Sequence, residues 1–188
     1  MPSDSTHVAL RVTDTLERLA IVYAVEGSIA SSDYGIARST VKANIIADMR
    51  PEHVAPLVAA LSIDFYADPH MIENAIREES HFTLVHYGTK FNVDVSIPKQ
   101  RPFDQMRLKR RIASVISSDP PRQVSVTTPE DAVLSKLERY RAGGESSYRD
   151  FREVLGASKI ADLDLAYLRH WAKELQVEDL LARALKGA

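Results

Sequence analysis

The chain has 188 residues, of which 45% are hydrophobic and 27% are charged, and its formal net charge is -2. This length allows one substantial hydrophobic core, or one core with a small helical appendage. The chain contains no cysteine, which excludes disulfides, zinc–thiolate sites and a cysteine nucleophile. The near-neutral charge argues against a surface that coats nucleic acid, although local basic patches are compatible with it.

The N-terminal sequence and the hydropathy of the chain predict a soluble protein. The first residues, MPSDSTHVALRV, lack a basic flank followed by an apolar run. No stretch approaches the roughly 18 apolar residues that span a bilayer. We therefore expect a cytoplasmic protein that makes no membrane contact.

The first half of the chain is predicted to alternate helices with short strands. Apolar residues recur at helical spacing in some segments and form short uninterrupted runs in others. In chain order, the predicted elements are a helix over 13–24, a strand over 23–26, a short helix over about 29–34, a strand over 43–47, a helix over 52–61 and a helix that Asp68 caps and Pro69 begins.

A β-hairpin over 81–87 and 90–97 is the clearest element of the sequence. Apolar and polar residues alternate on both sides of a Gly88-Thr89 turn, as a half-buried sheet requires. Asp94 alternates with buried valines on its strand, so its side chain is expected on the opposite face of the sheet.

The remainder of the chain is predicted to be mostly helical. Pro98 and Pro102 end the hairpin strand, and a last strand is expected over about 122–126. Thr128 is a candidate N-cap for a helix that begins at Pro129. Further helices are expected over 147–155, 164–175 and 177–185. These elements predict an α+β fold, with a core over 1–127 and a C-terminal helical subdomain over 128–188 that packs on it.

Gly27-Ser28 forms a predicted turn between the first strand and a short helix. Such a turn leaves backbone N–H groups pointing outward, where they can bind an anion such as a triphosphate. An ordinary connection between a strand and a helix is the commoner explanation of the turn taken alone.

The residues that follow this turn strengthen the functional interpretation. They are, in order, Tyr34-Gly35, Arg38, Thr40 and then Lys42-Ala43-Asn44 at the start of an apolar strand. With Gly27-Ser28, this pattern resembles motif one of the nucleotidyltransferase superfamily, and its spacing is similar to that of the AbiE-type and MenT-type toxin branch. The resemblance covers about residues 20–155. It implies a mixed β-sheet flanked by helices and Mg²⁺-dependent transfer of a nucleoside monophosphate from a nucleoside triphosphate to RNA, such as tRNA, or to protein. A cognate antitoxin is a further implied partner.

The chain departs from the family pattern at the metal site. The family has Asp-x-Asp where this sequence has Lys42-Ala43-Asn44. A protonated lysine cannot bind Mg²⁺, and an amide oxygen brings no negative charge. Asp94 matches the third acid of the family. The resemblance thus assigns Lys42, Asn44 and Asp94 to catalytic positions, makes Asn44 and Asp94 the candidate metal ligands, and predicts impaired catalysis. A naturally degenerate site and a deliberately altered one both fit this sequence.

The resemblance also implies residues that bind the nucleotide. Gly27, Ser28 and Arg38 would contact the triphosphate, and Lys136 would contact a phosphate as a catalytic and binding residue. Asp131 and Lys136 resemble a fourth family motif, but Lys136 also fits the polar face of an amphipathic helix, and Asp131 fits a first-turn helix acid better than a ligand.

A cluster of basic residues suggests a surface for RNA. The cluster comprises Lys99, Arg101, Arg107, Lys109, Arg110 and Arg111, and it could bind an RNA backbone. A solvated charged face is the commoner explanation. Three functions therefore stay open: an impaired nucleotidyltransferase, a non-catalytic regulatory module that binds a nucleotide, RNA or a partner protein, and a structural domain of a larger assembly.

Overall fold

The structure is a computed structural model, which describes residues 4–26, 42–118, 121–145 and 163–186. The chain divides into two compact units, Met1–Thr127 and Thr128–Ala188, and we describe each by itself. Within the described residues, no helix is both long enough and apolar enough to cross a lipid bilayer.

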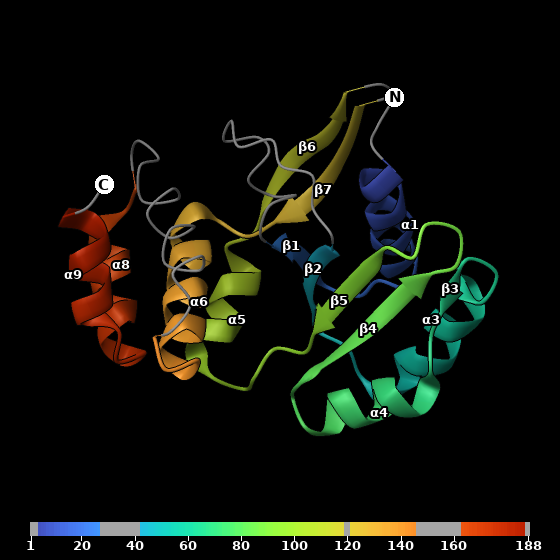
Figure 1. Cartoon of the computed structure of the whole chain (residues 1–188), viewed down its shortest axis with the longest axis horizontal. Helices are drawn as coiled ribbons and strands as arrows, with labels where there is room; N and C mark the ends of the chain where they lie inside the picture. Colours follow the sequence, from blue (N-terminus) through green and yellow to red (C-terminus); the bar gives the residue numbers. More distant parts are fainter. Residues whose placement is uncertain (1–3, 27–41, 119–120, 146–162, 187–188) are drawn as a thin grey trace. The chain divides into compact units, whose positions relative to one another are not determined.

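A seven-stranded mixed sheet, formed by described residues, is the framework of the first unit (Figure 1). Its strand order is β3-β4-β5-β2-β1-β7-β6. The strands are β1 (Tyr23–Glu26), β2 (Lys42–Ala47), β3 (Phe65–Tyr66), β4 (His81–His86), β5 (Asn92–Ser96), β6 (Ile112–Ser118) and β7 (Pro121–Val126). The pairs β2–β5 and β1–β7 are parallel, whereas the other neighbours are antiparallel.

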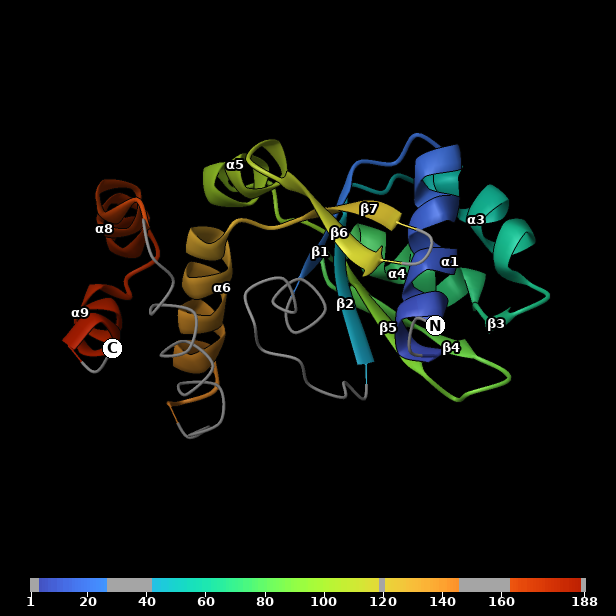
Figure 2. The same ribbon diagram turned by 90° about the horizontal axis from the view of Figure 1, so that it is seen from above.

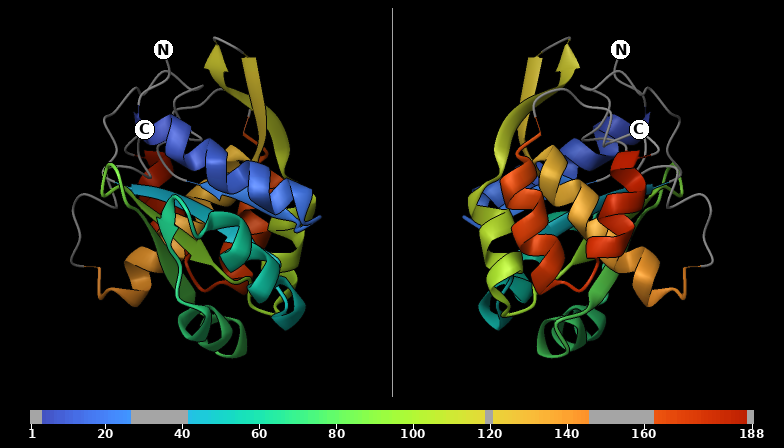
Figure 3. Two further views of the ribbon diagram at one scale, coloured as in Figure 1. Left: turned by 90° about the vertical axis from the view of Figure 1, so that its right-hand side faces the viewer. Right: turned by 90° about the vertical axis from the view of Figure 1, so that its left-hand side faces the viewer.

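The main hydrophobic core lies on one face of this sheet. Alternate residues of the central strands, such as Ile45, Val93 and Leu84, are almost fully buried there. The helices of this unit are α1 (Asp4–Arg18), the short 3-10 helix η2 (Pro51–His53), α3 (Val54–Leu61), α4 (Pro69–Arg77) and α5 (Pro102–Lys109). Residues of α1, α3 and α4 complete the main core, and the left panel of Figure 3 looks onto these helices.

The opposite face of the sheet carries a smaller apolar contact. Ala24 of β1 and Ile46 of β2 form a buried cluster with Leu108 of α5. Helix α5 therefore packs against the face of β1 and β2 that does not contribute to the main core. This placement brings α5 beside polar side chains that the same face carries.

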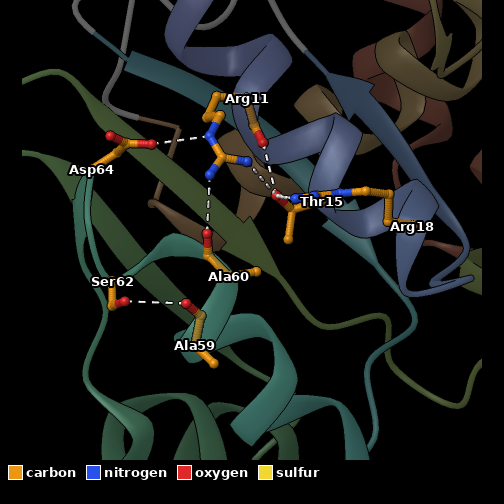
Figure 4. A network of polar contacts seen from close by, with 7 residues as sticks. All are labelled: Arg11, Thr15, Arg18, Ala59, Ala60, Ser62 and Asp64. Atoms are coloured by element: carbon orange, nitrogen blue, oxygen red, sulfur yellow. Dashed lines mark hydrogen bonds and ion pairs between the residues drawn. The ribbon is translucent and has the colours of Figure 1, made fainter.

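Helices α1 and α3 lie side by side, and Arg11 connects them (Figures 2 and 4). Its Nε forms an ion pair of 3.0 Å with Asp64 Oδ2, and its Nη2 donates to the carbonyl oxygen of Ala60 at 3.1 Å. Ala60 is in the last turn of α3, where carbonyl groups lack intrahelical donors. Arg11 thus satisfies the end of one helix from the side of another.

The second unit contains three described helices, α6 (Pro129–Ala142), α8 (Leu165–Glu174) and α9 (Glu178–Lys186). Thr128 caps α6, because its Oγ1 accepts a hydrogen bond from the backbone N–H of Asp131 at 3.3 Å. Arg141 near the end of α6 forms an ion pair of 2.5 Å with Asp179 of α9. Together with buried apolar residues such as Leu168, these contacts hold the three helices together.

The structure confirms the predicted α+β class but differs in detail from the elements predicted from the sequence. The helix predicted over 13–24 was wrong in its bounds: α1 ends at Arg18, and Ala20, with φ of 55°, turns the chain toward β1. Helix α5 and strands β3 and β6 were not predicted. The helices predicted over 29–34 and 147–155 lie outside the described residues.

Candidate functional site: a polar row across the sheet

Four polar residues form a row across the central strands. The register pairs Glu26 of β1 with Asn44 of β2, Asn44 with Asp94 of β5, and Asp94 with Thr83 of β4. Directly paired residues of neighbouring strands project to the same face of a sheet. Glu26, Asn44, Asp94 and Thr83, which we call the polar row, therefore share the face opposite the main core.

Lys42 belongs to the same site, because it lies two residues before Asn44 on β2 and so shares its face. Its Nζ is 2.5 Å from Asp94 Oδ2. Thr83 Oγ1 donates a hydrogen bond of 2.7 Å to the other oxygen, Asp94 Oδ1. Each oxygen of the Asp94 carboxylate therefore has a donor within the protein.

These contacts keep Asp94 ionised. Partial burial raises the pKa of the Asp94 carboxyl, but the hydrogen bonds from Lys42 and Thr83 lower it, as do the charges of Lys42 and His81. The net effect places the pKa of Asp94 below its ordinary value. The Lys42 side chain is 53% exposed, whereas that of Asp94 is 18% exposed. More than half of the Lys42 side chain is therefore open to solvent, whereas most of the Asp94 side chain is covered.

The other acid of the polar row is also ion-paired. Arg107 of α5 places its Nη1 3.2 Å from Glu26 Oε1, and both side chains are about one-tenth exposed. Arg107 Nη2 lies 3.8 Å from Asp104 Oδ1, and Arg101 Nε lies 2.7 Å from Asp104 Oδ2. A chain of alternating charges thus extends from the end of β1 into α5.

The described residues do not fit a metal centre built on several carboxylates. Mg²⁺ prefers oxygen ligands that carry negative charge. In the polar row, the charges of Asp94 and Glu26 are balanced by Lys42 and Arg107, and Asn44 contributes only a neutral amide. Within the described ranges, no group of three or more His, Asp or Glu side chains is arranged to hold a metal ion.

The structure brings together three of the predicted site residues and leaves the others apart. Lys42, Asn44 and Asp94 lie on one face of adjacent strands, while Gly27, Ser28 and Arg38 lie outside the described residues. Lys136 is on α6 of the second unit, and its role stays a prediction.

The structure shows Asp131 as a buried acid at the start of α6. Its Oδ2 accepts a hydrogen bond from Thr128 Oγ1 at 2.7 Å, and its Oδ1 accepts one from Tyr167 at 2.6 Å. These contacts support the interpretation of Asp131 as a first-turn helix acid.

Three residues of the site were missed by sequence reasoning: Thr83, Glu26 and Arg107. A signal existed for Thr83, because it precedes the Gly88-Thr89 turn by as many residues as Asp94 follows it. No local pattern connects Glu26 with Arg107. The interpretation of Arg107 as part of an exposed basic cluster was wrong, since its side chain is buried against Glu26 and Asp104.

Comparison with known proteins places this geometry in a fold class. The chain matches no protein-family model and no curated protein sequence. Among solved structures, it is similar to an antigenic nucleotidyltransferase-like protein from Paracoccidioides brasiliensis, with a TM-score of 0.57 and 19% identity over 100% of this chain and 94% of that chain.

Two further structures share the fold. The lincosamide antibiotic adenylyltransferase LnuA, solved with lincomycin bound, matches with a TM-score of 0.54 and 13% identity over 85% of this chain and 99% of that chain. The antibiotic-resistance factor ANT(2'')-Ia matches with a TM-score of 0.58 and 8% identity over 98% of this chain and 94% of that chain. The chain therefore has a nucleotidyltransferase-like fold.

Proposed function

We propose that this protein binds a nucleoside triphosphate at the polar row and that its capacity for nucleotidyl transfer is impaired at residues 42 and 44. The observation that carries the proposal is the contact of 2.5 Å between Lys42 Nζ and Asp94 Oδ2. Metal-dependent nucleotidyl transfer needs cations that neutralise the charge developing on the phosphates. Here the ammonium group of Lys42 forms an ion pair with Asp94, the carboxylate that would otherwise be available as a metal ligand.

Lys42 is still suited to bind a phosphate group. An ammonium group on a flexible stem binds phosphate as a point charge, and more than half of the Lys42 side chain is exposed. Asp94 keeps this ammonium positioned at the surface of the sheet. Gly27 follows Glu26 directly in the sequence, so the proposed phosphate-binding residues Gly27 and Ser28 come immediately after the last residue of β1. On this proposal, Mg²⁺ is dispensable for binding.

The finer assignment is also proposed. The resemblance to AbiE-type and MenT-type proteins supports a bacterial, cytoplasmic, toxin-like protein whose intact relatives would modify RNA such as tRNA, or protein, and which a cognate antitoxin would bind. The proposed binding of RNA has less support than the proposed binding of a nucleotide. Arg101 and Arg107, two of the six cations predicted to face RNA, form ion pairs inside the first unit.

A non-catalytic regulatory module is the second candidate function, and the same ion pair favours it. A site in which both acids are paired with cations can bind a nucleotide without transferring it. The two functions differ in one respect: restoring two acids at positions 42 and 44 should restore transfer only if the remaining machinery is intact.

The test compares the given chain with the double variant Lys42→Asp/Asn44→Asp. Each protein is incubated with Mg²⁺, each labelled nucleoside triphosphate and total RNA, and the label on RNA and on the protein itself is measured. We expect the double variant to transfer at least about a hundredfold faster, because it regains charge that can hold a metal ion. The matched control is Asn92→Asp, which adds an acid directly opposite Lys42 without restoring the motif.

Each outcome decides between the candidates. Transfer by the double variant alone supports an impaired nucleotidyltransferase, whereas equal transfer by the given chain contradicts the impairment. If neither protein transfers but the given chain binds a triphosphate in calorimetry, the regulatory module is favoured. Absence of both transfer and binding contradicts the proposed nucleotide site.

A further inference from the structure

A cavity opens at the far end of β2 from Lys42. It has a volume of about 390 Å³ and is lined by residues that follow β2, by residues at and just after the end of α4, by residues that follow β5 and by Gln105 of α5. All of these belong to the first unit. Asp48 of this cavity lies four residues beyond Asn44, which at the rise of a strand is roughly 13 Å along the chain. The cavity is therefore separate from the polar row.

Five polar side chains line this cavity without neutralising one another. They are those of Asp48, Arg50, Glu79, Gln100 and Gln105. Among the residues that the structure describes, the side chains of Asp48, Glu79, Gln100 and Gln105 have no hydrogen bond or ion pair, and Arg50 forms no ion pair with either acid. Elsewhere in this unit, opposite charges at a shared surface do pair, as Arg101 and Asp104 show. The charged side chains of the cavity instead form no ion pair with one another.

One wall of the cavity is apolar. Met49 and Ile97 line it and are 3% and 7% exposed, and Ile76 adds a partly buried side chain. The volume falls in the range of about 300–1,000 Å³ that small-molecule sites occupy. Polar groups make up most of the lining, so a ligand would be held mainly by polar contacts and would meet only a small apolar surface. A suitable ligand must carry a positive group, a negative group and a short apolar part.

We propose that this cavity binds a free α-amino acid with an apolar side chain. Asp48 and Glu79 accept hydrogen bonds from its ammonium group, and Arg50 binds its carboxylate. The apolar side chain packs on Met49 and Ile97. The amides of Gln100 and Gln105, each both donor and acceptor, complete the polar surroundings. This site does not depend on the function proposed for the polar row.

The first experiment measures binding to the full chain by isothermal titration calorimetry with L-leucine, L-valine and L-methionine. Two halves of leucine are compared with it: 3-methylbutylamine, which lacks the carboxylate, and 4-methylpentanoate, which lacks the amine. We expect leucine to bind at least about tenfold more tightly than either half, because each half leaves one charged group of the cavity without its partner.

The second experiment repeats the leucine titration with Glu79→Gln and Arg50→Gln. Each change removes one charge, with glutamine matching glutamate in length and being shorter than arginine, so each should weaken leucine binding by about tenfold. The matched controls are Glu78→Gln and Arg77→Gln, which remove the same charges from neighbouring residues that pair with each other outside the cavity. These controls should bind leucine as the unchanged chain does.

The results separate the proposal from its alternatives. Undetectable binding of all three amino acids at millimolar concentration overturns it. Equal binding of leucine and 3-methylbutylamine also overturns it and identifies a site for cations. Loss of binding in the control variants to the same extent as in the cavity variants would show that net charge, and not this cavity, governs the interaction.

Discussion

At the scale of single residues, hydrogen bonds from Lys42 and Thr83 hold the pKa of Asp94 below its ordinary value. A carboxylate with a lowered folded-state pKa adds stability that is complete above its unfolded pKa, about 4, and is lost as the pH falls through the folded value. The ion pair with Lys42 should therefore stabilise the protein at neutral pH and fail in acid. Because the folded-state pKa of Asp94 lies below the ordinary value, the carboxylate of the polar row stays ionised in mild acid and is protonated only in more strongly acidic solution.

Thr83→Val tests this dependence, because valine keeps the shape of threonine and removes the donor to Asp94 Oδ1. We expect the pKa of Asp94 to rise and the free energy of unfolding at pH 7 to fall by about 1 kcal/mol. Carbon-detected NMR titration of the carboxyl group and urea denaturation measure the two effects. The matched control is Thr89→Val at the hairpin turn, which should leave the pKa of Asp94 unchanged. An unchanged pKa in Thr83→Val would show that the hydrogen bond does not hold the charge.

At the scale of secondary-structure elements, the buried pair of Arg107 and Glu26 joins α5 to the end of β1. Removing one partner of such a pair leaves the other as an unpaired buried charge. Arg107→Met should therefore lower the free energy of unfolding by about 3–5 kcal/mol. Urea denaturation with Lys109→Met, an exposed position of the same helix, as control measures the difference. A loss no larger than that of the control would contradict a structural role for the pair.

The same elements show what the sequence could predict. The hairpin of β4 and β5 was predictable because its alternation and its turn are local. Helix α5 was missed because Pro102 was interpreted only as the end of a strand, although proline also suits the first turn of a helix. Strand β6, with the sequence IASVISS, shows no alternation of apolar and polar residues. The contact of Arg107 with Glu26 joins distant segments and depends on the packing of α5.

At the scale of the whole molecule, the formal net charge of -2 gives no general attraction for a triphosphate. Affinity must then come from cations placed locally, and within the described part of the site Lys42 is the more exposed of the two cations that face the row. Because this ammonium is already beside Asp94, binding of a nucleotide should not need a metal ion to bridge carboxylate and phosphate.

Removal of metal is therefore expected to leave nucleotide affinity unchanged, whereas Lys42→Gln should weaken it by about tenfold, the usual effect of losing a charged hydrogen bond. Calorimetric titration with the four nucleoside triphosphates, in EDTA and in Mg²⁺, measures both effects. The control Lys90→Gln removes a cation from the β4–β5 turn and should bind as the unchanged chain does. If EDTA abolished binding, a metal ion would have to be part of the site, and the place assigned to Lys42 would be wrong.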